Sequence, residues 1–115
     1  MLDYRRQSLE ILAQRRLNVR QTGLWGHAGL FNIAFSGADE TTFAGVQAML
    51  LQLCQDRHGA MEYCHGVGVR LAPLMEREHG AGLEVLRRLK QCLDPQGILN
   101  PGKLDLNPGP RPITS

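Results

Sequence analysis

The chain has 115 residues, of which 43% are apolar and 21% charged, and its net charge is +2. This composition is typical of a globular protein, and at this length folding removes roughly 65% of the unfolded chain's surface from water, enough for one core. The near-neutral charge and the 5% aromatic content argue against a nucleic-acid partner. Arginine pairs such as Arg87-Arg88 lie in helical patterns beside acidic residues, which favours a solvated face.

The three cysteines, Cys54, Cys64 and Cys92, are odd in number, widely spaced and contain no CxxC pair. This usage indicates a reducing compartment and neither a disulfide framework nor a structural zinc site. No apolar run approaches the ~20 residues that span a bilayer, and no apolar segment follows the N-terminal charges as in a signal peptide. We therefore expect a cytoplasmic protein with no transmembrane segment.

The first half of the chain predicts two helices and an apolar strand region. Residues 3–18 carry a modest apolar stripe of helical period, and residues 40–57 carry a clear one. Asp39 is the expected N-cap of the second helix, and Gly59 its expected stop in a left-handed conformation. Between the helices, residues 19–37 predict either one buried strand at 30–35 or two strands around a glycine-rich turn at 26–29.

The second half predicts a short strand over residues 60–64 and two further helices. Residues 70–79 read as a short helix that Gly80 and Gly82 break, with Pro73 in its first turn. Residues 83–93 form the last predicted helix, with leucines along one face.

After the last helix, residues 94–97 have the composition of a turn. The predicted fold class is α+β: a small, mostly antiparallel sheet, like half of a ferredoxin-like fold, with helices on one face and a C-terminal helix followed by an NPGK loop. We assign residues 1–104 to this domain and residues 105–115, rich in proline and glycine, to a disordered tail.

His65 is the main candidate for chemistry, since it stands at the start of the turn His-Gly-Val-Gly. Gly66 and Gly68 let a ligand approach the backbone closely, and a histidine at this corner suits proton transfer. The pattern alone leaves both readings open and favours a structural histidine over a functional one. His27, in Gly-His-Ala-Gly, has a similar setting, and the two histidines would face one pocket if their strands were neighbours.

A metal site from these residues is not expected. His27 and His65 with Cys64 or Glu62 could offer three metal ligands. Cys64 and His65 are adjacent, however, and in the predicted strand they would point to opposite faces, so a zinc site made from both would need a bulge. His58 and His79 lie at predicted helix ends, where an imidazolium favours the helix dipole. The sequence also lacks a GxSxG nucleophile, a P-loop and a dinucleotide-binding glycine motif.

Two segments near the C-terminus carry a family resemblance: CHGVGVRLAPLMEREHG and LEVLRRLKQCLDPQGILNPGKL. They resemble the end of the C-terminal (cap) domain of FAD-linked oxidases of the vanillyl-alcohol oxidase superfamily. That group includes glycolate oxidase, D-lactate dehydrogenase and alkyldihydroxyacetonephosphate synthase. The most specific part is Lys90, Asp94-Pro95 and the run Ile98 to Lys103; a weaker third match is GHAGLFN at residues 26–32.

The resemblance implies a function shared with an FAD-binding domain that this chain lacks. It implies that His65 lies near the flavin as substrate binder or acid/base, with His27 and Asn32 lining the same pocket. It implies that Gly66, Gly68, Asn100 and Lys103 approach the cofactor. The expected protein is thus the substrate-side portion of an FAD-dependent oxidoreductase acting on a hydroxy-acid-like small molecule, inactive without its FAD domain.

Departures from the family's pattern remove its metal site. Of the two histidines and one glutamate that bind metal in the dehydrogenase branch, this chain keeps only His27, with Ala34 and Cys64 in the other two places. Cys64 and the glycines that follow are closer to the H-H-H-G-V-G of the synthase branch. The alternative function is a non-catalytic, ferredoxin-like binding or interaction module.

Overall fold

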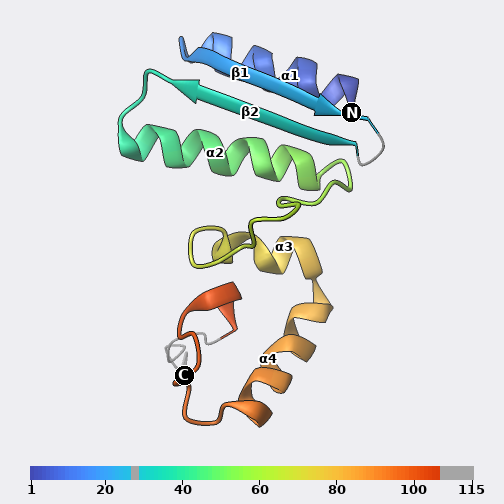
Figure 1. The fold of residues 1–115 in the computed structure, drawn as a ribbon, viewed down its shortest axis with the longest axis vertical. Coiled ribbons are helices and arrows are strands. Elements are labelled where there is room, and N and C mark those ends of the chain that lie inside the picture. Colours follow the sequence, from blue (N-terminus) through green and yellow to red (C-terminus); the bar gives the residue numbers. More distant parts are fainter. Residues whose placement is uncertain (27–28, 107–115) are drawn as a thin grey trace, which may run out of the picture. The chain divides into compact units, whose positions relative to one another are not determined.

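The computed structural model describes residues 1–26 and 29–106, which form two compact units. The first unit spans Met1–Tyr63 and the second begins at Cys64. No helix in the described ranges is both long and apolar enough to cross a membrane. In chain order the elements (Figure 1) are α1 (Leu2–Gln14), β1 (Asn18–Trp25), β2 (Leu30–Ser36), α2 (Glu40–Gln55), the 3-10 turn η1 (Ala72–Leu74), α3 (Met75–His79), α4 (Ala81–Leu93) and η2 (Lys103–Asp105).

The first unit consists of a two-stranded antiparallel sheet with two helices on one face. Phe31 and Phe35 occupy alternate positions of β2 and therefore share a face of the sheet. Tyr4 of α1 meets the ring of Phe31 edge to face at 5.7 Å, and Phe43 of α2 stacks on Phe35 at 4.7 Å. Both helices cover the same face, which confirms the predicted α+β fold class.

The core of this unit joins the two helices across the sheet. Leu12, Leu17, Val46 and Leu50 are all buried and form one cluster. The hydroxyl of Tyr4 donates a hydrogen bond to the carbonyl of Leu50 at 3.0 Å, which ties α1 to α2. Burial raises the pKa of the Tyr4 hydroxyl.

Of the two arrangements expected for residues 19–37, the chain forms the hairpin. Asn18 lies opposite Ser36 and Trp25 opposite Leu30 in the antiparallel register. Gly29 ends the turn with φ +61°, a left-handed value that glycine adopts without a steric penalty. His27 lies outside the described residues, so its expected approach to His65 stays a prediction.

Both helix predictions in this unit are confirmed, with different ends. The helix predicted over 3–18 stops at Gln14, because Arg16 takes φ +56° and the N–H of Leu17 bonds back to the carbonyl of Leu12. This reversal directs Leu17 into the core. At the start of α2 the expected cap is present, since the carboxylate of Asp39 accepts the N–H of Thr42 at 2.7 Å.

Gly59 follows α2 as predicted, but for a different reason. The left-handed residue is His58, with φ +57°, and the N–H of Gly59 bonds to the carbonyl of Cys54 at 3.0 Å. A Cβ at position 59 would lie 2.5 Å from the Cys54 Sγ and 3.2 Å from its carbonyl oxygen. Glycine is required here for close approach, and the predicted left-handed stop at this residue is wrong.

The strand predicted over residues 60–64 is wrong. In the described ranges the sheet holds only β1 and β2, and residues 60–64 follow an irregular path of bends. A strand without a neighbouring strand leaves its backbone N–H and C=O groups unpaired, so apolar character alone does not form one.

The second unit is helical, and its buried side chains include Met75 and Leu83. The helix predicted over 70–79 is present as η1 followed by α3, with Pro73 in the initial 3-10 turn. Gly80 ends α3 with φ +50°, as predicted. Gly82 does not break a helix, because α4 already begins at Ala81.

The close approach at Gly59 gives a paired test. Gly59→Ala should destabilise the protein by about 1–3 kcal/mol, because the new Cβ overlaps Cys54 and one contact is to backbone. Gly45→Ala, in the middle of α2 where a Cβ meets nothing within 4 Å, should stabilise it by about 0.5–1 kcal/mol. Denaturant unfolding measures both, and effects of the same sign would contradict this account.

Candidate functional site

Two loops that are distant in sequence lie together in the second unit. They are the turn at residues 65–68 and the loop at residues 100–103. The N–H of Leu104 donates to the carbonyl of Gly68 at 3.0 Å and so joins them. Gly102 has φ +74°, and a Cβ there would lie 3.8 Å from a valine side chain that follows the first turn. The loops form one corner, which we call the two-loop corner.

The carboxylate of Asp94 fixes the path into the second loop. Its two oxygens accept the N–H groups of Ile98 at 3.0 Å and Leu99 at 2.9 Å, and it pairs with the ammonium of Lys90 on α4. Lys90 also donates to the carbonyl of Leu99. The hydrogen bond from Lys90, with those from the two N–H groups, holds the pKa of Asp94 below its ordinary value although its burial opposes this.

Arg87 holds the far side of the same loop. Its guanidinium donates to the Asp105 carbonyl at 3.1 Å and to the Asp105 carboxylate at 2.6 Å. The side chain of Arg87 is only 15% exposed, whereas that of Arg88 is 78% exposed and pairs with Glu84. The predicted solvated face is therefore correct for Arg88 and wrong for Arg87. Asp105, which the sequence placed in the tail, belongs to η2.

The predicted site residues of the two-loop corner are accessible. His65, Gly66, Asn100 and Lys103 are exposed, and Gly68 is half-buried. Gly66 and Gly68 have φ of +78° and +58°, and a Cβ built on either one would meet nothing within 4 Å. The backbone of the first turn thus presents an open surface that a flat ligand can approach.

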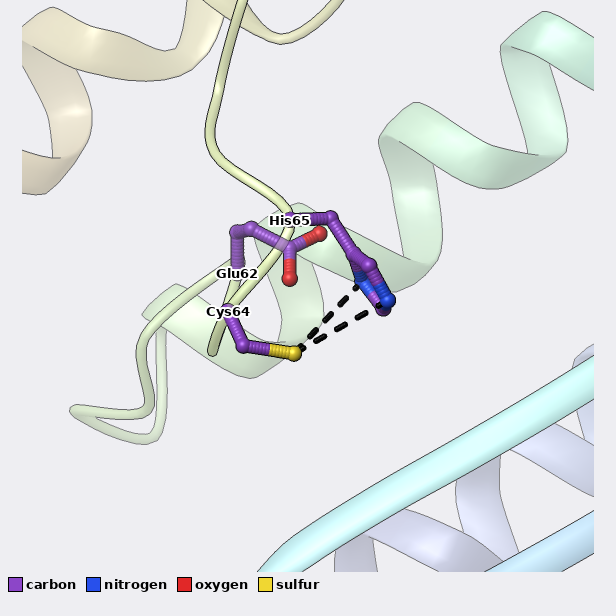
Figure 2. A group of neighbouring side chains, drawn as sticks. All are labelled: Glu62, Cys64 and His65. Carbon is purple, nitrogen blue, oxygen red and sulfur yellow. Dashed lines mark hydrogen bonds between the residues drawn. The ribbon is translucent and has the colours of Figure 1, made fainter.

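Cys64 and His65 lie side by side, contrary to the sequence argument that separated them. The Cys64 sulfur is 3.9 Å from Nδ1 and 3.8 Å from Nε2 of His65 (Figure 2). One oxygen from the Glu62 carboxylate completes a group of three ligand-type atoms, all within 4.8 Å of one another. The alternation argument fails because residues 60–64 are not a strand.

Asn32, the remaining predicted site residue, lies in the first unit on the sheet face opposite the helices. It is exposed and pairs in register with Gly23 of β1. The indole of Trp25 covers Gly23 so closely that a Cβ there would lie 2.8 Å from the ring. Trp25 is 53% exposed, and its contact with Gly23 was not predicted from the sequence. Its position two residues after a glycine in a predicted strand could have indicated that contact.

Comparison with known proteins identifies one family over nearly all of the described chain. A family model described as "FAD linked oxidases, C-terminal domain" matches residues 2–104. Alkyldihydroxyacetonephosphate synthase of Trypanosoma brucei brucei is 34% identical over 67 residues, which are 57% of this chain and 11% of the synthase. The family model therefore covers both loops of the two-loop corner.

Two further relatives are an oxidoreductase and a dehydrogenase. An uncharacterized FAD-linked oxidoreductase of Mycobacterium tuberculosis is 35% identical over 80 residues, covering 67% of this chain and 17% of that protein. D-lactate dehydrogenase of Archaeoglobus fulgidus is 31% identical over 85 residues, covering 70% of this chain and 19% of the dehydrogenase. The chain thus spans less than a fifth of these relatives' lengths. No solved structure matches.

The role of Asp94 can be tested by amide hydrogen exchange at Leu99. Asp94→Asn removes the charge that Lys90 and two N–H groups share, so exchange at Leu99 should accelerate by about tenfold or more. Because the pKa of Asp94 is lowered by folding, the same protection should be present above about pH 4 and be lost as the pH falls through the folded-state pKa.

The matched control for this test is Glu84→Gln, which removes an exposed ion pair from the same helix. It should leave exchange at Leu99 unchanged. Equal protection of Leu99 in the Asp94 variant and the parent chain would show that the carboxylate does not hold the loop.

Proposed function

Because the chain belongs to the family of FAD-linked oxidase C-terminal domains, we propose that it is the substrate-side portion of an FAD-dependent oxidoreductase. It would act on a small molecule with a CH–OH group, of the hydroxy-acid class. One relative is named as a dehydrogenase of D-lactate, which is a hydroxy acid, and this supports the substrate class.

The observation that supports this proposal best is the hydrogen bond between the two loops. The His-Gly-Val-Gly turn and the Asn-Pro-Gly-Lys loop are the segments that most resemble the family, and the Leu104 N–H to Gly68 carbonyl bond joins them in one unit. If the two motifs resembled the family only by chance, there would be no reason for them to lie in contact. Two segments that bind the same ligand must lie close together, as these two do.

The residues of the corner fit a flavin on one structural ground. The positive φ values at Gly66 and Gly68 leave a side-chain-free stretch of backbone, and no atom lies where a Cβ would extend. A planar ring system can rest on such a stretch. In the loop that bonds to this turn, Asn100 offers an amide and Lys103 a cation, and both are exposed, which suits the polar and anionic parts of the cofactor. FAD, when bound, supplies a two-electron acceptor.

In this proposal His65 handles the substrate's hydroxyl proton. His65 is exposed and immediately precedes the open turn, which supports a role toward a substrate held beside that backbone. Accepting the hydroxyl proton as the hydride leaves the carbon would yield the carbonyl product. Asn32 and His27 are proposed to contact the substrate, with Asn32 presented on the open face of the hairpin.

The flavin would be held mainly by a separate FAD-binding domain or subunit. A face of α4 supports such a partner: Val85, Leu89 and Leu93 follow one another at intervals of four and stay exposed, Leu93 by 79%. Exposed apolar stripes of this kind mark surfaces that bind another protein. We place the assembly in the cytoplasm, because an odd number of widely spaced cysteines is typical of a reducing compartment.

The role of His65 can be measured in the chain combined with its FAD-binding partner. His65→Asn should slow single-turnover oxidation of the substrate by about 10²-fold or more, because the group that accepts the proton is removed. Tyr63→Phe changes an exposed neighbour and should leave the rate unchanged. An unaltered rate in the His65 variant would remove this residue from the mechanism.

A further inference from the structure

The side chains of Glu62, Cys64 and His65 form a cluster that the proposed flavin chemistry does not account for (Figure 2). Among the described residues it is the only group of three or more histidine, cysteine or acidic side chains close enough to share an ion. It lies within four consecutive residues, so the local backbone determines its geometry. We propose that this cluster binds one thiophilic divalent cation of the Zn²⁺ class.

The distance between sulfur and imidazole is close to what zinc requires. With Zn–S of about 2.3 Å and Zn–N of about 2.0–2.1 Å, a tetrahedral ion holds these two atoms about 3.6 Å apart. In the structure the Cys64 Sγ is 3.8 Å from Nε2 of His65. A small rotation of these two exposed side chains closes the difference between them.

Glu62 supplies the third ligand from a constrained position. Its Oε1 accepts the N–H of Tyr63 at 2.8 Å, which keeps the carboxylate folded back toward the chain. One carboxylate oxygen lies within 4.8 Å of the other two ligand atoms. Three protein ligands leave one tetrahedral position for water, the usual composition of an open zinc site.

The donor set selects the cation. Thiolate, imidazole and carboxylate together suit Zn²⁺ and its neighbours in the transition series, whereas Mg²⁺ and Ca²⁺ prefer oxygen ligands alone. Binding must displace the Cys64 thiol proton, so each metal bound should release about one proton. The site differs from the dehydrogenase-type triad, of which this chain keeps only His27.

Bound metal would also have a consequence for activity. The His65 ring that ligates the ion could not at the same time accept a substrate proton, so the cation would inhibit. This consequence rests on the proposed function, whereas binding itself does not. Binding is therefore measured on the full chain alone, without flavin or substrate.

The experiment titrates Zn²⁺, and Co²⁺ as its coloured substitute, into the reduced full-length chain. We expect one ion per chain, proton release, and a thiolate-to-Co²⁺ charge-transfer band in the near ultraviolet. Cys64→Ser should abolish the band, and Cys64→Ser, His65→Asn and Glu62→Gln should each weaken Zn²⁺ binding by about tenfold or more. Cys92→Ser, which changes an exposed cysteine on α4, should change neither.

Several results would overturn the proposal. They are no Zn²⁺ binding by the parent chain, one ion per two chains, or binding that Cys64→Ser leaves intact. Loss of the band in Cys92→Ser would assign the site to another cysteine. Since Cys64 and His65 are exposed, circular dichroism should show each variant folded, and so a loss of binding reports on the ligands.

Discussion

The structure of the C-terminal part depends on the Asp94 carboxylate, which bonds both to the helix before it and to the loop after it. The carboxylate accepts hydrogen bonds from Lys90 and from the N–H groups of Ile98 and Leu99, and these bonds fix the path of the chain through the proline-containing turn. The loop that follows then returns to the His-Gly-Val-Gly turn through its bond to Gly68. Lys90 and Asp94, which belong to the motif that most resembles the family, are therefore the residues that hold this loop in place.

Periodic segments were predictable from sequence, and close contacts were not. The apolar repeat of α2, its cap at Asp39 and the glycine-rich hairpin turn are local signals that packing reinforces. The supposed strand at 60–64 failed because strand formation depends on a neighbour that local sequence cannot specify. Gly59 and Arg87 were misread for a similar reason: one is required by the proximity of a sulfur atom, and the other pairs with Asp105, which is distant in sequence.

The candidate site was predicted in part. The meeting of the two loops agrees with the motif resemblance, and Cys64 in a glutamate's place stays the reason to expect no dehydrogenase-type metal triad. The same residue, once the strand is removed, lies against His65 and beside Glu62, where it forms a different group of possible ligands. The incorrectly predicted strand at residues 60–64 thus concealed a possible group of metal ligands. The chain spans less than a fifth of the relatives it matches, which agrees with an apolar face on α4 that nothing described in the chain covers.

We propose that this chain works beside a flavin that is held mainly by a separate FAD-binding domain or subunit. The most direct measurement is flavin absorbance in affinity-purified chain from its own cells, compared with the chain produced alone. The account predicts flavin that co-purifies with an FAD-binding domain or subunit, that is lost in the doubly substituted Leu89→Ser, Leu93→Ser chain, and that is retained in Arg88→Ala. Stoichiometric flavin on the chain produced alone, or none in either preparation, would contradict it.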